Sequence, residues 1–246
     1  MSVAMATYNG ANWITEQLDS ILAELGPDDE VVVVDDGSRD GTADIVASQG
    51  DPRVRLIRSE HNTGYVRAFE RALRTTTRDV VLLADQDDVW LPGRRDAMVA
   101  ALRDHEVVAS NVVILGEDRG LRGPLGQEDW RLRTSDQHRH RANVAGILAG
   151  IRPYYGCAMG IRREVLDGAL PFPDYLIESH DLWLAIYGNL RRSIAHLEQP
   201  TLQRRVHADN ATPESPRGVR QAAQSRLMLA RAVVDLRRRA AAAPRP

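Results

Sequence analysis

Three carboxylates follow one short apolar segment, and their spacing favours a metal site. The apolar run Val80 to Ala84 is followed directly by Asp85, Asp87 and Asp88, with Gln86 between the first two acids. Most Asp-x-Asp pairs in loops are solvated turns or helix N-termini. Three clustered carboxylates, however, repel one another unless a cation or arginines neutralise them. Oxygen ligands of this kind suit a hard divalent ion such as Mg²⁺ or Mn²⁺, which can act as a Lewis acid.

A second acidic pair, Asp35-Asp36, follows the apolar run Val31 to Val34. One interpretation is a turn in which Ser38 or Asp40 caps the next helix. The other is that a carboxylate at this strand end accepts hydrogen bonds from a nucleotide base or ribose, and the segment alone leaves both open. A phosphoacceptor receiver domain also has an acidic pair after a strand, but it needs a lysine. The chain contains no lysine, so this third possibility fails.

The elements that would position these acids alternate between strand and helix over the first 115 or so residues. Apolar runs predict strands at 2–7, 31–34, 54–58 and 80–84, and helical periodicity predicts helices at 12–25, 40–47, 63–74 and 92–105. Asn12 is the expected N-cap of the first helix. Alternating strands and helices imply right-handed crossovers and a mostly parallel sheet. Ligands of such sheets bind at the carboxyl ends of the strands, where the acidic clusters lie.

After about residue 116 the pattern is less regular. Residues 116–142 are polar and predict a long loop with short elements, 147–161 a turn into a short strand, and 179–187 a helix. Residues 217–239 predict an amphipathic helix rich in arginine. We therefore divide the chain into an α/β half (1–115), a second half of the same domain (116–216) and a C-terminal helix with a tail (217–246).

Composition excludes several classes of mechanism. All 32 basic residues counted as lysine or arginine are arginines, so Schiff-base chemistry and a P-loop lysine are excluded. A net charge of −2 gives no reason to expect nucleic-acid binding. Cys157 is the single cysteine, which excludes an intrachain disulfide, and we expect it in the core. No apolar run is long enough to span a bilayer and no signal peptide is visible, so we expect a cytoplasmic protein.

Several segments, in their order and spacing, resemble family 2 glycosyltransferases over roughly residues 2 to 210. No single motif is specific, but their joint order is. The segments that carry the family resemblance are 6–10 (Ala-Thr-Tyr-Asn-Gly), 34–42 (Val-Asp-Asp-Gly-Ser-Arg-Asp-Gly-Thr), 62–64 (Asn-Thr-Gly) and 83–92 (Leu-Ala-Asp-Gln-Asp-Asp-Val-Trp-Leu-Pro). Three later segments, 155–159, 180–183 and 204–210, resemble the bacterial rhamnosyltransferase-like subgroup.

The resemblance implies the nucleotide-binding GT-A fold, with 1–115 as the nucleotide-sugar half and 116–216 as the acceptor and catalytic half. It places the donor sugar nucleotide on the turns after three strands. By position, the donor-binding residues would be Thr7, Tyr8, Asn9, Asp35, Asp36, Asp85 and Gln86. Asp87 would be the principal ligand of a divalent metal (Mn²⁺ or Mg²⁺), with Asp88 supporting the loop. His207 would approach the metal or diphosphate, unless it is a surface histidine.

The family mechanism is inverting transfer, which needs one general base to deprotonate the acceptor hydroxyl. Such proton transfer is typically worth about 10² to 10⁴ in rate. By resemblance, Asp181 is the base and His180 orients it or contacts the acceptor. A competing interpretation is that Asp181 only caps a helix, and Glu178 is the alternative base.

Substrates are predicted only coarsely. The subgroup favours dTDP-L-rhamnose or another deoxyhexose donor, with a UDP-sugar as the alternative. Processive relatives carry a Gln-x-x-Arg-Trp motif; here residues 203–206 read Gln-Arg-Arg-Val, so single-sugar addition is expected. The acceptor would be a saccharide, lipid-linked or a small molecule, in cell-surface glycan or secondary-metabolite glycosylation.

Two further alternatives remain open from the sequence. The C-terminal helix either packs an apolar stripe on the domain or contacts an anionic membrane surface. A non-catalytic nucleotide-sugar-binding protein would need Asp35 and Asp87 but not Asp181. A sugar-phosphate nucleotidyltransferase would need a Gly-rich phosphate loop and usually a lysine, both absent here.

Overall fold

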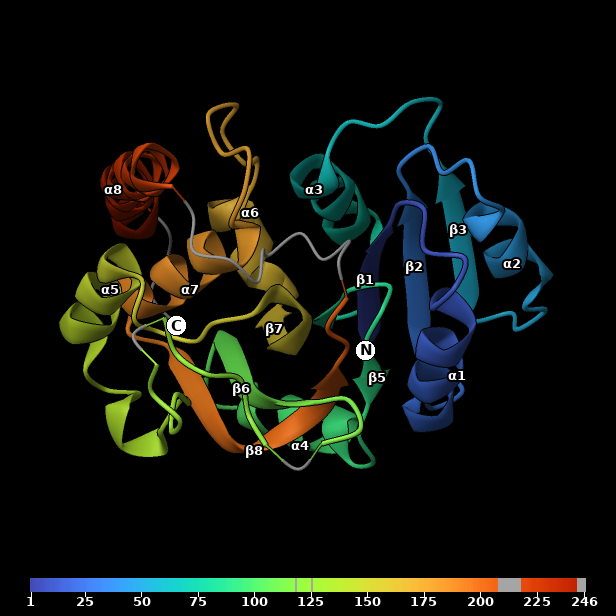
Figure 1. Ribbon diagram of the computed structural model, residues 1–246, viewed down its shortest axis with the longest axis horizontal. Coiled ribbons are helices and arrows are strands. Elements are labelled where there is room, and N and C mark those ends of the chain that lie inside the picture. The colour runs from blue at the N-terminus through green and yellow to red at the C-terminus, as the bar shows by residue number, and fades with distance from the viewer. Residues whose placement is uncertain (118, 125, 208–217, 243–246) are drawn as a thin grey trace.

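The computed structural model describes residues 1–117, 119–124, 126–207 and 218–242, and its centre is one sheet flanked by helices (Figure 1). The strand order is β3-β2-β1-β4-β7-β6-β8-β5. The strands are β1 (Ser2–Thr7), β2 (Glu30–Asp35), β3 (Val54–Arg58), β4 (Val80–Ala84), β5 (Val89–Trp90), β6 (Val107–Ile114), β7 (Met159–Arg162) and β8 (Ile194–Arg204). The α-helices are α1 (Ile14–Glu24), α2 (Thr42–Ser48), α3 (Tyr65–Thr75), α4 (Arg94–Ala101), α5 (His140–Ala149), α6 (Leu166–Ala169), α7 (His180–Arg191) and α8 (Val219–Ala242). Short 3₁₀ helices lie at η1 (Thr134–Asp136), η2 (Gly156–Ala158) and η3 (Arg163–Val165).

The first half of the sheet confirms the predicted parallel arrangement. β1 lies between β2 and β4 and is parallel to both, and β2 is parallel to β3. The run Val31 to Val34 is fully buried because helices cover both faces of this part of the sheet. The carboxyl ends of β1, β2 and β4 therefore meet along one edge, as the acidic clusters require.

The second half of the sheet adds antiparallel pairs to this parallel arrangement, although β6 and β8 are parallel to each other. β7 is antiparallel to both β4 and β6, and β5 is antiparallel to β8. The sequence pattern missed β6 because buried Ser110 and Asn111 interrupt its apolar run. The Asn111 amide is satisfied within the fold, donating to the carbonyl oxygens of Leu132 and Glu198 at 2.9 and 2.8 Å. The sequence pattern also missed α5 and β8, which lie in the less regular part of the chain after residue 116.

Two predicted helix starts change in the structure. Asn12 does not cap α1; Trp13 occupies that position, and the Gly10 carbonyl accepts the amides of Trp13 and Ile14. At α2, the N-cap is Gly41 and not Ser38 or Asp40, although the Asp40 carboxylate accepts the Thr42 amide at 3.0 Å. Helix α4 spans Arg94–Ala101, shorter at both ends than the predicted 92–105.

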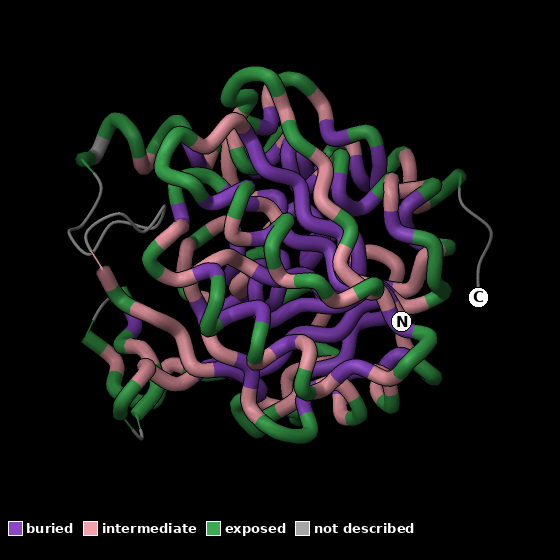
Figure 2. Tube along the Cα trace, turned by 90° about the vertical axis from the view of Figure 1, so that its right-hand side faces the viewer, coloured by how far each residue is buried: buried purple, intermediate pink, exposed green. Residues whose placement is uncertain are grey.

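The core fills both sides of the sheet, and Figure 2 shows buried chain through the centre of the molecule. Cys157 is buried there, as expected. The C-terminal helix α8 packs an apolar stripe against the domain, which includes Leu229, Val233 and Leu236. In the described part of the chain, no helix has the length and apolar character needed to cross a bilayer.

Candidate active site

A cavity of about 380 Å³ opens where the carboxyl ends of β1 and β4 face the N-terminus of α7. Eight of the predicted site residues line it: Thr7, Tyr8, Asp36, Asp85, Gln86, Asp87, His180 and Asp181. Three predicted site residues, Asn9, Asp35 and His207, do not line it, although Asp35 accepts the Thr7 hydroxyl and His207 lies beside Asp87. Strands distant in sequence thus bring the predicted donor residues and the predicted base to one cavity.

The turn after β1 is held in place by the loop after β4. The Gln86 side-chain oxygen accepts the Tyr8 amide at 2.8 Å, and its side-chain nitrogen donates to the Tyr8 carbonyl at 3.1 Å. This pairing leaves the Tyr8 side chain half exposed at the cavity wall. Asn9 points elsewhere, because its side-chain oxygen accepts the Arg39 amide at 2.9 Å. Gln86 and Asn9 therefore both organise the turns around the cavity.

Both acids of the Asp35-Asp36 pair are buried and serve the turns. Asp35 accepts the Thr7 hydroxyl at 3.1 Å and the Ser38 amide and hydroxyl at 3.0 and 2.5 Å. Asp36 accepts the Thr63 amide and hydroxyl at 3.0 and 2.8 Å. The Gly64 amide donates to Asp36 as well, at 2.8 Å. Both carboxylates thus hold turns of the chain, and Asp36 also lines the cavity.

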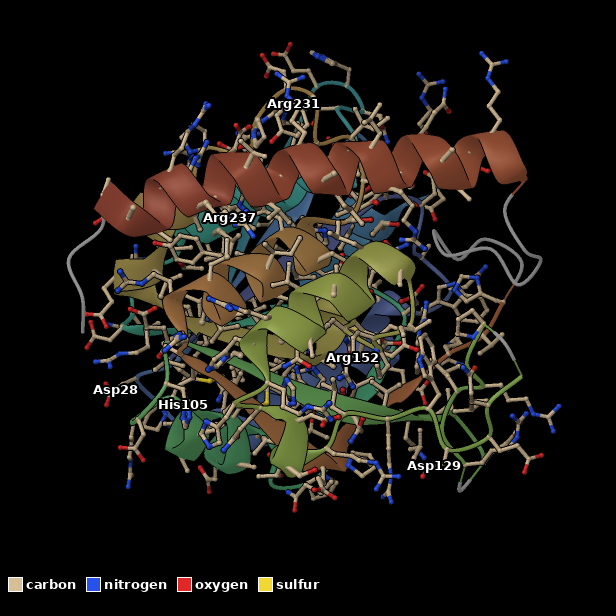
Figure 3. The ribbon with its side chains drawn as sticks, turned by 90° about the vertical axis from the view of Figure 1, so that its left-hand side faces the viewer. Asp28, His105, Asp129, Arg152, Arg231 and Arg237 are labelled. Atoms are coloured by element: carbon tan, nitrogen blue, oxygen red, sulfur yellow. The ribbon has the colours of Figure 1, made fainter. Side chains whose placement is uncertain are left out.

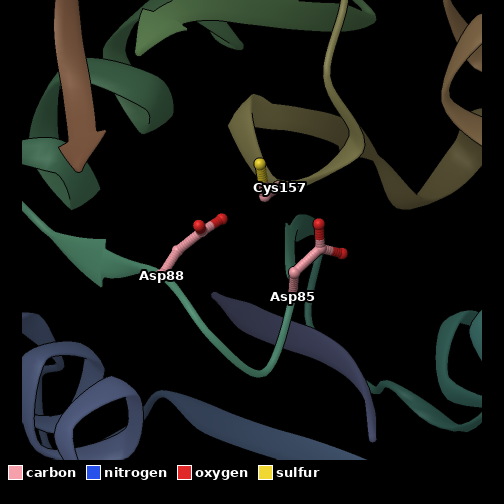
Figure 4. Close-up of side chains that lie close together, drawn as sticks. All are labelled: Asp85, Asp88 and Cys157. Atoms are coloured by element: carbon pink, nitrogen blue, oxygen red, sulfur yellow. The ribbon is translucent and has the colours of Figure 1, made fainter. Parts of the chain in front are cut away.

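The loop after β4 crowds two acids and the single cysteine (Figure 4). Side-chain atoms of Asp85, Asp88 and Cys157 lie within 4.8 Å of one another. Burial, followed by repulsion from Asp88 and Asp87, raises the pKa of Asp85 well above its ordinary value. Burial and Asp87 raise the pKa of Asp88 to about 6, although a hydrogen bond with Cys157 opposes this shift. Burial raises the pKa of the Cys157 thiol strongly, so this group stays protonated and packs.

Asp87 meets His207 on the other side of the loop. The His207 Nε2 atom lies 2.9 Å from Asp87 Oδ2. The Trp13 indole stacks on the His207 ring, with centroids 5.1 Å apart. Arg205 extends over the same indole and donates to the Asp87 carbonyl at 3.0 Å. The two residues that the family resemblance assigned to the metal are therefore neighbours.

The loop after β4 suits a divalent cation. Among the described residues, no side chain donates a hydrogen bond to the Asp85 carboxylate. One Asp88 oxygen is buried without a partner in the same part of the chain. A cation beside Asp87 would relieve the repulsion that raises the pKa of Asp85 and Asp88. Carboxylate oxygens and an imidazole are also ligands that Mn²⁺ accepts.

The predicted base lies at the N-terminus of α7. Burial raises the pKa of Asp181 to about 6, although the Leu182 amide donates to its carboxylate at 2.8 Å. Its position in the first helical turn favours the ionised form through the helix dipole. Glu178 is turned toward α8, where its carboxylate accepts the Ser225 hydroxyl. Of the two candidate bases, Asp181 is the one that lines the cavity.

His180 is an unusual buried histidine. It is 5% exposed, and neither ring nitrogen has a hydrogen-bond partner in the described part of the chain. Its ring stacks on Phe69, with centroids 4.2 Å apart, and meets the edge of Tyr65. Burial lowers its pKa to about 3, so the imidazole is neutral. Its nitrogens can therefore exchange hydrogen bonds with a hydroxyl-bearing ligand without carrying charge.

Two arginines that the sequence did not single out shape the cavity. Arg204 is the last residue of β8, where it pairs with Ile114 of β6; its guanidinium stacks over the Tyr155 ring at 5.1 Å and lines the wall. Burial opposes its charge, yet the surrounding acidic groups, Asp85 among them, raise its pKa. No described residue accepts a hydrogen bond from its guanidinium. The sequence shows two adjacent arginines at 204 and 205, but no local pattern indicates which of them faces the cavity.

Arg94 supports the site from beneath. It is almost completely buried and donates to Thr201 Oγ1 at 2.5 Å and to the Cys157 carbonyl at 2.6 Å. Burial lowers its pKa to about 10, which leaves it charged at neutral pH. Its guanidinium lies over the Trp90 ring at 4.5 Å. This one side chain links α4, β8 and the segment that carries Cys157.

The chain belongs to the glycosyl transferase family 2, whose model matches residues 2–169. It is 32% identical over 183 residues to an uncharacterized glycosyltransferase of Nostoc, and the match covers 70% of this chain and 53% of that protein. It is 25% identical over 107 residues to the Escherichia coli UDP-Glc:alpha-D-GlcNAc-diphosphoundecaprenol beta-1,3-glucosyltransferase WfgD, covering 44% of this chain and 42% of that one. The chain thus spans about half the length of these curated relatives.

Solved structures confirm the GT-A glycosyltransferase fold. S. aureus TarS 1-349 in complex with UDP-GlcNAc superposes with a TM-score of 0.69 at 22% identity, covering 92% of this chain and 64% of that one. Mycobacterium tuberculosis glucosyl-3-phosphoglycerate synthase, solved with Mn²⁺, UDP and glucosyl-3-phosphoglycerate, superposes with a TM-score of 0.57 at 20% identity, covering 98% of this chain and 79% of that one.

Proposed function

We propose that this chain transfers a single sugar from a nucleoside-diphosphate donor to a hydroxyl acceptor, with inversion at the anomeric carbon. The observation that carries the proposal is the shared cavity, in which the acidic loop after β4 faces Asp181 at the start of α7. A family 2 member with a nucleotide-binding half and a partly buried carboxylate in one cavity has the groups that such a reaction needs. Residues 1–115 form the donor half, 116–216 the acceptor and catalytic half, and 217–246 the C-terminal helix and tail.

Donor binding falls to the carboxyl ends of β1, β2 and β4. Tyr8, half exposed at the wall, stacks on the base, and Thr7 and Asn9 shape its turn. Asp35 and Asp36 hold the turns that receive base and ribose. Both carboxylates already accept hydrogen bonds from the turns. We therefore assign their contact with base and ribose to the remaining lone pairs of the carboxylates and to the backbone of the turns. The other donor-binding groups are Asp85, Gln86 and the guanidinium of Arg204, which donates to none of the described residues and would face the diphosphate.

The divalent metal, Mn²⁺ or Mg²⁺, belongs beside Asp87 and His207. When bound, it supplies charge that stabilises the departing nucleoside diphosphate. The relative solved with Mn²⁺ and UDP supports this choice. Arg204 adds a fixed positive charge to the same wall, which is useful because the leaving group gains negative charge as the bond to the sugar breaks.

Asp181 acts as the general base. It takes the proton from the acceptor hydroxyl as that oxygen attacks the anomeric carbon, and the diphosphate leaves from the opposite face of the sugar. A pKa of about 6 keeps the carboxylate ionised at neutral pH while raising its basicity. Neutral His180, beside it, contacts a hydroxyl of the acceptor or donor sugar through its unpartnered nitrogens.

For the substrates we propose a dTDP- or UDP-sugar, with L-rhamnose or another deoxyhexose as the sugar. The acceptor is a saccharide, lipid-linked or small, used in cell-surface glycan or secondary-metabolite glycosylation. The E. coli relative named for a diphosphoundecaprenol acceptor supports the lipid-linked class. A lipid-linked acceptor places the protein in the cytoplasm, at the inner face of the membrane.

The test is thermal stability against a panel of nucleoside diphosphates and sugar nucleotides, with and without Mn²⁺, followed by turnover. A ligand at a hundredfold excess over its Kd raises stability by about 2.7 kcal/mol, so the true donor is visible. A metal-dependent shift, lost in Asp87→Ala, supports the donor site, and product formation lost in Asp181→Asn supports catalysis. Binding without turnover for any acceptor would favour the non-catalytic nucleotide-sugar-binding alternative. No shift with any nucleotide would overturn the proposal.

A further inference from the structure

Helix α8 packs one side on the domain and leaves the other side exposed. Leu227 and Val234 lie on the exposed side, with exposed fractions of 74% and 48%. They are seven positions apart in the sequence, so they lie two turns apart on one line of the helix. Arg231 and Arg238, also exposed, continue this line. Figure 3 shows α8 across one face of the molecule, with Arg231 on its outer side. We call these four residues the outer stripe.

The outer stripe belongs to a strongly basic helix. Residues 219–242 contain six arginines and one aspartate, a net charge of +5, whereas the whole chain carries −2. An exposed apolar line between arginines is the pattern of a helix that lies in the interface of an anionic bilayer. Its aliphatic side chains enter the headgroup region, while the arginine heads meet lipid phosphates.

A neighbouring loop adds a second apolar group. Ile177, in the loop 170–179 before α7, is 77% exposed. This loop is fastened to α8, because Tyr175 donates to the Asp235 carboxylate at 2.5 Å and Arg231 lies over the Tyr175 ring at 4.0 Å. Loop and helix therefore form one surface. The loop contributes two negative charges, so loop and helix together still carry +3.

This surface adjoins the cavity. Ser179, two residues after Ile177, lines the cavity wall, as do the next two residues, His180 and Asp181. Two residues of chain span at most about 7 Å, so the apolar tip of the loop is close to the mouth on the side of the predicted base. A sheet of lipid resting on α8 and Ile177 would lie beside the acceptor side of the cavity.

We propose that the outer stripe of α8 and Ile177 dock on an anionic lipid bilayer and turn the acceptor side of the cavity toward it. The docking itself stands on exposure and charge. Its consequence, access to a membrane-borne acceptor, rests on the proposed function. An anionic bilayer fits better than a protein groove because the apolar line is narrow and the exposed arginines Arg231, Arg237 and Arg238 lie in it or beside it.

Vesicle flotation of the full chain tests the docking without any activity. The probes are phosphatidylcholine vesicles with and without one third phosphatidylglycerol. The chain should float with the anionic vesicles only, and high salt should weaken binding. Leu227→Gln with Val234→Gln should weaken binding by about tenfold, since both aliphatic groups leave the interface. Arg237→Gln with Arg238→Gln should weaken it by on the order of tenfold through lost attraction to the anionic lipid.

A matched charge control is Arg55→Gln with Arg58→Gln on β3, at the far edge of the sheet from α8 (Figure 1). This pair removes the same charge and should leave flotation unchanged. No flotation with anionic vesicles, or equal loss in the control, would overturn the docking. Lipid-independent dimers that the Leu227/Val234 variant abolishes, seen by sedimentation velocity, would assign the stripe to a second copy and also overturn it.

Transfer to a water-soluble acceptor separates this inference from the proposed function. The Leu227/Val234 variant should keep that activity and lose transfer to a vesicle-borne acceptor. A wild-type chain that transfers sugar but binds no vesicle would overturn only the docking. A chain that floats but transfers nothing would overturn only the proposed function.

Discussion

His207 Nε2 lies 2.9 Å from Asp87 Oδ2, although 120 residues separate the two positions in the chain. Both side chains are largely shielded from solvent; the Trp13 indole stacks on the histidine ring, and Arg205 lies over that indole. In the proposed donor site, this carboxylate and imidazole would supply two of the ligands of the divalent metal. The segment after β8 would then belong to the proposed donor site.

We expect His207→Ala and Asp87→Ala each to abolish the stabilisation by Mn²⁺ with UDP or dTDP while leaving the fold intact. Removing either ligand leaves too few protein groups to hold the ion beside the diphosphate. Thermal shift with and without Mn²⁺ measures this, and the exposed His138→Ala is the matched control. A Mn²⁺ response that survives in both variants would place the metal elsewhere.

Trp13 is expected to position His207. Replacing the indole by Ala removes the surface on which the imidazole stacks. Mn²⁺ affinity should fall by roughly tenfold, as is typical when a residue that orients a metal ligand is replaced. Trp13→Phe keeps part of the stack and should recover most of the affinity. Titration of Mn²⁺ followed by electron paramagnetic resonance, in the presence of UDP, reports affinity directly. Equal losses in Ala and Phe variants would point to a general packing defect.

Activity should rise with pH through about 6. Asp181 must be ionised to accept a proton, and burial raises its pKa to about 6. The measurement is kcat/KM across pH 5 to 8 at saturating metal. A profile that is flat from pH 5 upward would show that the acting base has an ordinary carboxylate pKa, and so is not a buried Asp181.

Asp181→Asn should lower turnover by about 10² to 10⁴ and yet stabilise the fold at neutral pH. The folded protein retains the Asp181 proton up to about pH 6, whereas the unfolded chain releases it near 3.8. Native protein therefore binds more protons in this window, and stability falls as pH rises through it. The amide removes this cost, about 3 kcal/mol at pH 7.5 and about 0.5 kcal/mol at pH 4. Urea unfolding at both pH values checks the sign; destabilisation at pH 7.5 would contradict it.

Arg94→Met should destabilise the protein by about 2–4 kcal/mol, because the Cys157 carbonyl and Thr201 hydroxyl lose a buried charged donor. The exposed Arg103→Met, at the end of the same helix, controls for the loss of charge and should change stability little. Urea unfolding compares the two. Equal stabilities would mean that water or a shifted side chain replaces the Arg94 contacts.

The sequence by itself determined the elements whose signals are local. Uninterrupted apolar runs predicted β1, β2 and β4, because a strand buried on both faces needs apolar residues throughout, whereas Arg55 interrupts the run of the edge strand β3. The parallel order then predicted that the acids after these strands lie at one edge of the sheet. The resemblance added the family, and with it Asp87, Asp181 and His207 as candidates. These predictions needed only the residue types and their order.

Only the tertiary structure decided which side chains line the cavity together. β6 was hidden because Ser110 and Asn111 are buried and hydrogen-bonded to segments distant in the chain. Whether Arg204 or Arg205 faces the cavity depends on how β8 pairs with β6, and a shift of one residue turns a side chain to the other face. The choice of Asp181 over Glu178 as the acid that lines the cavity depends in the same way on packing. Such contacts form between residues far apart in sequence, so no local pattern encodes them.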